Sequence, residues 1–344
     1  MLEGVKVVEL AYFYPGPFCT ELLAELGANV IKVEPKSGDP MRYNKAAFAA
    51  LNRNKKSLFL DLKNSKDKDK FFEIVKDADV LVEGFRPGVA KKLGVDYESV
   101  KKINPSIVYC SISGFGQNSS LKDIPVHDIN VMSFAGICKI SGLKLNVPLD
   151  PNVQLSDFAS AMFATVAILS ALFRKFREGI GCYIDISMMD SAFAAIPLHT
   201  SSILNGFGNL KDFVENPGYE IYKLKDGYIS VGIMDEPHFW KNLCNALGLE
   251  YLSKVSYSER IEKCDEIKRA IQDKFVEMDI DSAVKLLRNS NIPFGVVYSI
   301  DEALKIIDER GIVCNARHDN ETYKVVGFPA IFSNYTPKRD GKVE

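Results

Sequence analysis

Short runs of β-branched and other apolar residues recur along the first half of the chain, and stretches with helical spacing lie between them. The runs that predict strands cover residues 5–10, 29–34, 57–62, 79–82, 107–112 and 182–187. The stretches that predict helices cover residues 17–26, 65–76, 97–103 and 157–177. This alternation is typical of an open parallel sheet with helices on both faces, where ligands bind beyond the carboxyl ends of the strands.

The pattern changes after about residue 190. Residues 219–232 predict a hairpin, and helices are expected at 237–247, 258–278 and 281–290, with further strands at 294–298 and 321–326. We therefore expect an α/β protein with a large domain of residues 1–190 plus about 306–344, a linker of residues 191–214, and a smaller α+β domain of residues 215–305. The polar tail 336–344 is expected to be frayed.

Composition narrows the classes of function. The chain has 344 residues and a formal net charge of −2, which gives no general attraction to nucleic acid or to acidic membranes. Its seven cysteines are scattered without a C-x-x-C pair, and its four histidines lie far apart. These features predict free thiols in a reducing cytoplasm, and they argue against a metal site.

One apolar run, residues 158–173, is a candidate membrane span. It is shorter than the roughly 20 residues that cross a bilayer, so a buried core helix is predicted instead. The first ten residues lack the apolar stretch of a signal peptide and lead directly into a strand pattern. We therefore predict a cytoplasmic protein without a membrane segment.

Basic residues occur in three loops beside predicted strands. Arg42 ends the segment 38–42, Arg53 and Lys56 lie in 52–56, and Arg86 lies in 83–88. Their convergence on one end of the sheet would suit a phosphorylated ligand, although ordinary solvated surface is the alternative, above all for a lysine. A nicotinamide cofactor is not expected, because the loop 11–17 contains two prolines and lacks G-x-G-x-x-G.

A histidine and an aspartate stand out as candidates for proton transfer. His127 follows Pro125 and precedes Asp128, and Asp157 comes just before the long apolar run. An imidazole and a carboxylate on opposite sides of one carbon can remove a proton from one face and return it to the other. The alternative is structural: Asp128 could cap a helix with His127 incidental, and Asp157 could simply cap the apolar helix. At a helix N-terminus Asp157 is expected to stay ionised.

Glu236 is a third candidate. It lies between Asp235 and Pro237, at the end of the predicted hairpin of the small domain. It could orient an imidazole, or it could be an acidic residue that favours the start of a helix. The sequence pattern favours neither interpretation over the other.

Nine segments follow one another along much of the chain: GVKVVEL at 4–10, PGPF at 15–18, LGANVIKVE at 26–34, GDPMR at 38–42, NRNKKS at 52–57, DLK at 61–63, EGFRPG at 83–88, SGFGQ at 113–117 and GCYIDIS at 181–187. With these segments the chain resembles, over nearly its whole length, the class III CoA-transferase superfamily, and within it the α-methylacyl-CoA racemases.

The resemblance implies a Rossmann-like large domain, an interlocked homodimer and an acyl-CoA substrate that needs no separate cofactor. The residues expected to bind CoA are Arg42, Arg53, Lys56, Glu83, Gly84 and Arg86. In the transferases an aspartate at the position of Asp157 is the nucleophile. In the racemases this aspartate and a histidine at the position of His127 form the acid/base pair, assisted by a glutamate like Glu236. Transferases usually carry a small residue where His127 stands. Asp235 directly precedes Glu236, so either carboxylate could fill the assisting position.

The expected reaction is the interconversion of (2R)- and (2S)-2-methylacyl-CoA by proton transfer through an enolate. We expect backbone amides at the start of the Asp157 helix to stabilise the enolate oxygen. Two alternatives remain: a CoA-transferase with Asp157 as nucleophile, and a non-catalytic protein that binds acyl-CoA.

Overall fold

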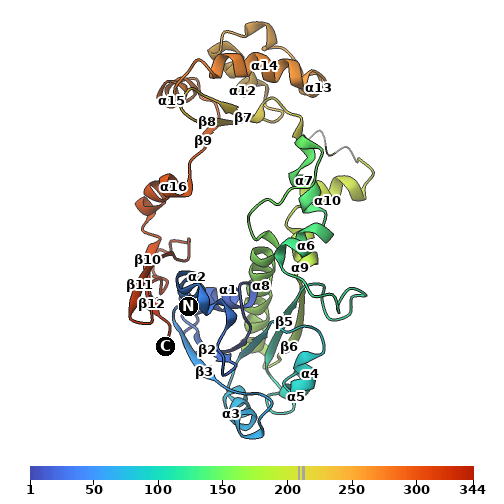
Figure 1. The fold of residues 1–344 in the computed structure, drawn as a ribbon, viewed down its shortest axis with the longest axis vertical. Helices are drawn as coiled ribbons and strands as arrows, with labels where there is room; N and C mark the ends of the chain where they lie inside the picture. Colours follow the sequence, from blue (N-terminus) through green and yellow to red (C-terminus); the bar gives the residue numbers. More distant parts are fainter. Residues whose placement is uncertain (208–209, 211–213) are drawn as a thin grey trace. The chain divides into compact units, whose positions relative to one another are not determined.

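The computed structural model describes residues 1–207, 210 and 214–344, which divide into two compact units (Figure 1). The large unit comprises residues 1–139, 149–200 and 307–344, and the small unit comprises 140–148 and 201–306. Residues 140–148 thus belong to the small unit, although the sequence analysis assigns them to the large domain. The expected linker includes the helix α10 (Pro197–Leu204), and its residues 208, 209 and 211–213 lie outside the described residues.

The large unit is built on a six-stranded parallel sheet with the order β3-β2-β1-β4-β5-β6. The strands are β1 (Lys6–Leu10), β2 (Asn29–Glu34), β3 (Lys55–Phe59), β4 (Val80–Glu83), β5 (Val108–Ser113) and β6 (Cys182–Ser187). All six were expected, but β3 begins and ends earlier than the apolar pattern predicts, because Lys55 is buried in an ion pair with Glu9. The strand order reverses between β1 and β4, which is where an open sheet usually binds its ligand.

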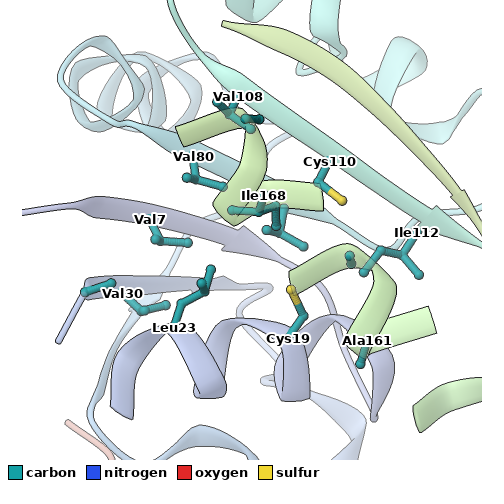
Figure 2. Close-up of a cluster of buried hydrophobic side chains, with 14 of the residues drawn as sticks. Val7, Cys19, Leu23, Val30, Val80, Val108, Cys110, Ile112, Ala161 and Ile168 are labelled. Atoms are coloured by element: carbon teal, nitrogen blue, oxygen red, sulfur yellow. The ribbon is translucent and has the colours of Figure 1, made fainter. Parts of the chain in front are cut away.

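Helices cover both faces of this sheet. On one face α1 (Pro15–Glu25) and α8 (Leu155–Glu178) pack against residues such as Val7, Val80 and Cys110 (Figure 2). On the other face α3 (Ser65–Lys76), α4 (Val89–Leu93) and α5 (Tyr97–Lys101) cover alternate residues such as Val8 and Leu81. Neighbouring strand residues therefore point into different cores, which explains the continuous apolar runs.

Helix α8 is longer than its apolar run suggests, with 24 residues. Within the described residues it is the one helix whose length and composition would suffice to cross a membrane, and half of that stretch is buried inside the protein. Its buried face includes Ala161, Ala164 and Ile168, which belong to the core under the sheet. The remaining elements of the large unit are η1 (Pro40–Tyr43), α2 (Lys45–Asn52), α6 (Asp128–Phe134) and α9 (Met188–Ala194).

A second sheet of the large unit corrects the expectation of a frayed tail. Strands β10 (Val313–His318), β11 (Glu321–Val326) and β12 (Gly341–Lys342) form it in the order β11-β10-β12. The last residue is also fixed, because the N–H of Glu344 donates to Lys55 O at 3.0 Å and its carbonyl accepts from Ser57 N–H at 2.6 Å. Backbone pairing orders this tail although its side chains are polar.

The small unit has a three-stranded antiparallel sheet of β7 (Tyr219–Lys223), β8 (Tyr228–Gly232) and β9 (Phe294–Val296). Its helices α12 (Pro237–Ala246), α14 (Cys264–Phe275) and α15 (Ile280–Asn289) bury Trp240 and other apolar side chains against the sheet. The helix expected at 258–278 is two helices, α13 (Tyr257–Glu262) and α14. The small unit also contains η2 (Leu143–Leu145), η3 (Glu250–Leu252) and nearly all of α16 (Ile300–Ile307). Helix α7 (Ile137–Ser141) spans the boundary between the units, and η4 (Asp308–Arg310) belongs to the large unit.

Candidate functional site

A cavity of about 320 Å³ opens at the carboxyl ends of β1, β4 and β5. The loops after these three strands line it, together with the segment that leads into α6. Four residues singled out from the sequence are among its lining: Gly84, Arg86, His127 and Asp157. This is the position at which the reversal of strand order predicts a ligand.

A second cavity of about 750 Å³ adjoins the first and shares Phe13, His127 and Asp157 with it. Most of its other lining residues are apolar and come from α1, η1, α2 and the segments before α6 and α8. The two candidate proton-transfer residues therefore lie where the two cavities meet. A ligand that extends through both cavities would meet both residues.

His127 is the residue that precedes α6. Its backbone N–H donates to Asn130 Oδ1 at 3.0 Å, and its exposed imidazole lies perpendicular to the ring of Phe13, with 5.8 Å between ring centroids. Asp128 was expected as the cap of this helix, but His127 occupies that place and Asp128 is the first helical residue. The exposed imidazole belongs to the lining of both cavities.

Asp128 has a different role, which the sequence analysis missed. Its buried carboxylate accepts hydrogen bonds from the backbone N–H groups of Ser156 at 2.8 Å and Asp157 at 3.0 Å, and from the Ser156 hydroxyl. The carboxylate from α6 therefore caps the start of α8 and fixes the residue that carries the candidate carboxylate.

The environment of Asp157 contradicts the expectation that it stays fully ionised. Burial, and then the negative charge of Asp128, raise the pKa of Asp157 from 3.8 to about 7. A carboxyl with such a pKa is present in both protonation states near neutral pH. It can therefore act as a base or as an acid, which suits proton transfer in either direction.

The backbone N–H groups at the start of α8, which were expected to bind an enolate oxygen, have hydrogen-bond partners within the protein. Asp128 accepts the N–H groups of Ser156 and Asp157, Val153 O accepts that of Leu155 at 3.0 Å, and Gln154 O accepts that of Phe158 at 3.0 Å. The N–H groups of Leu155, Ser156 and Asp157 thus already have partners within the protein, so the prediction that amides of this turn stabilise an enolate oxygen lacks support from this geometry.

Glu236 lies in the small unit, where it precedes α12. Its carboxylate accepts the Met234 N–H at 2.8 Å and so closes the turn between β8 and the helix. Asp235 lies 3.8 Å from the guanidinium of Arg260. The helix-start interpretation of Glu236 thus has a direct structural counterpart, while its assistance to His127 stays a prediction.

The basic residues expected to bind CoA differ in their exposure and in the ion pairs they already form within the protein. Arg42 is half-buried and forms a two-point ion pair with Glu34, at 2.6 and 2.8 Å. Arg53 is almost fully buried, and its guanidinium bonds to Glu25 at 2.6 Å and contacts Glu21 at 2.7 Å. Lys56 is exposed. Arg53 lines the second cavity, but its buried guanidinium is held by Glu21 and Glu25 of α1, so its role as a CoA contact stays a prediction.

Glu83 and its neighbours form the other side of the first cavity. Glu83 is buried, and its carboxylate accepts hydrogen bonds from the Phe85 N–H at 2.7 Å and from the Ser111 hydroxyl. These bonds hold the loop after β4. Burial raises the pKa of Glu83 to about 7. Arg86 is exposed on this loop and lines the cavity, as does Lys122, which the sequence analysis did not single out. The two cations suit a phosphorylated ligand at this end.

A third cavity, of about 430 Å³, lies beside the first. It is formed by the carboxyl ends of β1 and β2 and the residues after β3, and it shares Tyr12 and Phe85 with the first cavity. Among the described residues no cluster of three or more His, Cys, Asp or Glu side chains could hold a metal ion.

Comparison with known proteins identifies the family. A sequence model described as CoA-transferase family III matches residues 2–342. The chain belongs to CoA-transferase family III. A solved structure of a CAIB/BAIF family protein from Brucella suis covers all of this chain and 95% of its own, with a TM-score of 0.86 and 27% identity. The α/β fold with a large parallel sheet and a smaller sheet domain is that of this family.

Relatives within family III differ in their named reactions. A succinyl-CoA:glutarate CoA-transferase of Mus musculus is 30% identical over 96% of this chain and 80% of its own length. An α-methylacyl-CoA racemase of Homo sapiens is 34% identical over 80% of this chain and 72% of its own length. Membership therefore establishes an enzyme family, and the reaction must be argued from the site.

Proposed function

We propose that this member of family III is a racemase that interconverts (2R)- and (2S)-2-methylacyl-CoA thioesters. The observation that carries the proposal is the position of His127 and Asp157, which both line the junction of the two cavities. The thioester carbonyl acidifies the α-carbon, and one of the two residues removes its proton to give a planar enolate. The other residue then delivers a proton to the opposite face.

The CoA part of the substrate would occupy the first and third cavities. Arg86 and Lys122 would meet phosphate oxygens, and the cavity beside Tyr12 and Phe85 would take the nucleotide. The acyl group would then enter the larger second cavity. We expect Arg86→Ala to raise the KM for acyl-CoA with little change in kcat, because a phosphate contact acts in binding and not in the chemical step. An unchanged KM would remove Arg86 from this assignment.

The main test follows the α-proton of the substrate. In D₂O, without any acceptor acid, the protein should exchange the α-hydrogen of a 2-methylacyl-CoA and interconvert its enantiomers. His127→Ala and Asp157→Asn should each lower racemisation by about 10²–10⁴-fold, since each removes one proton-transfer group. Absence of exchange by the wild-type protein would contradict the proposal.

The alternative, a CoA-transferase with Asp157 as nucleophile, is favoured by the reaction names of several relatives. It predicts no exchange without an acceptor, a covalent acyl intermediate on Asp157, and CoA transfer once a carboxylic acid is added. It also predicts that His127→Ala retains activity. Mass spectrometry of the protein after incubation with acyl-CoA distinguishes the two reactions.

We also propose that the active form is a homodimer in the cytoplasm. Helix α8 leaves several large apolar side chains exposed, namely Phe158, Phe163, Val166, Phe173 and Phe176. Several large exposed apolar side chains on one helix are what an interface would cover. Light scattering should give twice the chain mass, and a monomer would contradict this assembly. All seven cysteines are free thiols, which suits a reducing compartment.

A further inference from the structure

Phe13 has a strained backbone at the junction of the two cavities. Its φ of 63° lies in the left-handed region, which L-residues other than glycine, asparagine and aspartate rarely adopt. The side chain is 39% exposed, so burial of its ring does not offset the strain. Strain of this kind persists only where the surrounding structure imposes it, and it concentrates at functional sites.

A buried ion network imposes this conformation from one side. The Phe13 N–H points to Asp39 Oδ1 at 3.4 Å, and the other oxygen of Asp39 pairs with Lys32 Nζ at 2.9 Å. The same ammonium group donates to Ala11 O at 2.7 Å and pairs with Glu9 at 2.6 Å. One fully buried lysine thus holds both the residue before the loop and the carboxylate that receives Phe13.

Close packing fixes the loop from the other side. A Cβ atom added at Gly16 would lie 2.3 Å from the Cβ of Ala11, so the start of α1 packs directly against the end of β1. The Phe18 N–H donates to Tyr14 O at 2.8 Å, and Pro15 follows Tyr14. Both ends of the loop are therefore pinned against each other, and Phe13 must bridge them with a strained backbone.

The result of this arrangement is the contact between Phe13 and His127. The two rings are perpendicular, with an interplanar angle of 87° and 5.8 Å between centroids, a favourable aromatic geometry. His127 is itself exposed, and its backbone N–H donates to Asn130 Oδ1 at 3.0 Å. The ring of Phe13 therefore limits the directions in which the imidazole can point.

We propose that Phe13 is a positioning residue that holds the imidazole of His127 in the orientation required for transfer of the α-proton. The inference rests on the proposed racemase function. The strained backbone places the aromatic ring against the imidazole, and the buried network of Glu9, Lys32 and Asp39 maintains that strain. The network of buried charges thereby contributes to catalysis without touching the substrate.

The two enantiomers of the substrate report separately on the two proton-transfer residues. Asp157 can remove the α-proton of one enantiomer, and in D₂O the same carboxyl can return a deuteron to the same face of the enolate. This enantiomer then exchanges with retention of configuration even when His127 fails. Exchange that starts from the other enantiomer requires His127 to remove the proton.

Three variants of Phe13 distinguish the effect of its aromatic ring from the effect of its strained backbone. Asparagine and glycine accept a left-handed backbone and carry no aromatic ring, so Phe13→Asn and Phe13→Gly should unfold at a temperature equal to or above that of the wild type. Both should slow exchange by about tenfold or more for the enantiomer whose exchange is lost in His127→Ala, with kcat reduced and KM unchanged. Phe13→Tyr keeps the ring and should retain exchange within about threefold for both enantiomers.

Several outcomes would overturn this inference. Equal slowing of both enantiomers, or no slowing in Phe13→Asn and Phe13→Gly, would show that Phe13 does not act through His127. If the wild-type protein exchanges neither enantiomer, the racemase proposal itself fails, which the Phe13 variants alone cannot cause.

Discussion

Two carboxylates of the large unit, the fully buried Glu9 and the partly buried Asp157, have opposite electrostatic surroundings. Glu9 pairs with Lys32 at 2.6 Å and with Lys55 at 2.8 Å, and although burial acts in the other direction, these two lysines lower the pKa of Glu9 to about 2. Asp157 has the carboxylate of Asp128 nearby, and burial together with this charge raises the pKa of Asp157 to about 7.

The difference shows how one chemical group serves two purposes. Opposite charges keep Glu9 ionised at every physiological pH, so it can organise β1, β2 and β3 but cannot exchange protons. Burial beside a like charge leaves Asp157 poised between its two forms, at a cost in stability. Structural and chemical carboxylates can therefore be distinguished by their neighbours.

The largest expected effect comes from breaking the Glu9 network. Glu9→Gln leaves Lys32 and Lys55 buried without their shared carboxylate, and we expect it to lower the free energy of unfolding by about 3–5 kcal/mol. Urea unfolding at pH 7 measures this. The difference in the free energy of unfolding between the wild type and Glu9→Gln should narrow as the pH falls from about 4.5 towards 2. Over this range the wild-type carboxylate becomes protonated in the native state too.

A matched control for Glu9 lies on the surface of α8. Glu178 pairs with Arg174 at 2.9 Å, but both side chains are about half exposed. Glu178→Gln should change the free energy of unfolding by less than about 0.5 kcal/mol. If the two substitutions cost the same, the buried network does not stabilise the large unit in the way described.

Asp157→Asn should have an intermediate effect on stability, with the opposite sign. Because the native pKa of about 7 lies above the ordinary 3.8, the unfolded chain releases this proton first, and the wild type loses stability as the pH rises from about 4 to 7. The amide cannot ionise. At pH 8 the variant should therefore be more stable by roughly 1–2 kcal/mol, a value reduced for the partial exposure of the group.

Stability curves of the wild type and Asp157→Asn from pH 3 to pH 9 provide this measurement. The two curves should coincide below about pH 4, where both side chains are neutral, and separate above it. A variant that is less stable than the wild type at pH 8 would show that Asp157 is a structural carboxylate like Glu9.

Within the Glu9 network, a smaller effect than that of Glu9→Gln is expected from Thr20→Val. The Thr20 hydroxyl donates to Glu9 Oε2 at 2.5 Å, and valine has nearly the same shape. Since both lysines remain, we expect a loss of about 1 kcal/mol in the free energy of unfolding, and no change in the exchange reaction. A loss as large as that of Glu9→Gln would mean that the hydroxyl, and not the lysines, keeps Glu9 ionised.

The parallel sheet could be predicted from the sequence because its strands are buried on both faces and therefore read as continuous apolar runs. The prediction failed where polar residues are ordered by partners distant in the chain. Lys55 begins β3 through its ion pair with Glu9, and residues 341–342 form β12 by pairing with β10. Neither partner can be inferred from local spacing.

The candidate site was predictable in part. His127 and Asp157 were found from residue type and setting, and the structure brings both to the same cavities. The carboxylate of Asp128 that caps α8, and the left-handed backbone of Phe13, went unnoticed. A phenylalanine gives no sequence signal of a positive φ, and a cap supplied by another helix lies outside any local motif.

The residues that pack against α2 lie far along the chain from it, and this has a consequence for biosynthesis. Its residue Ala49 packs against Cys314, Ala316 and Val325, and the guanidinium of Arg53, which follows this helix, donates to Arg339 O at 2.9 Å. A ribosome makes these partners only after the whole small unit has been synthesised. Until then the apolar face of α2 in the growing chain lacks the side chains that cover it, and the Arg53 guanidinium lacks the Arg339 carbonyl that accepts its hydrogen bond.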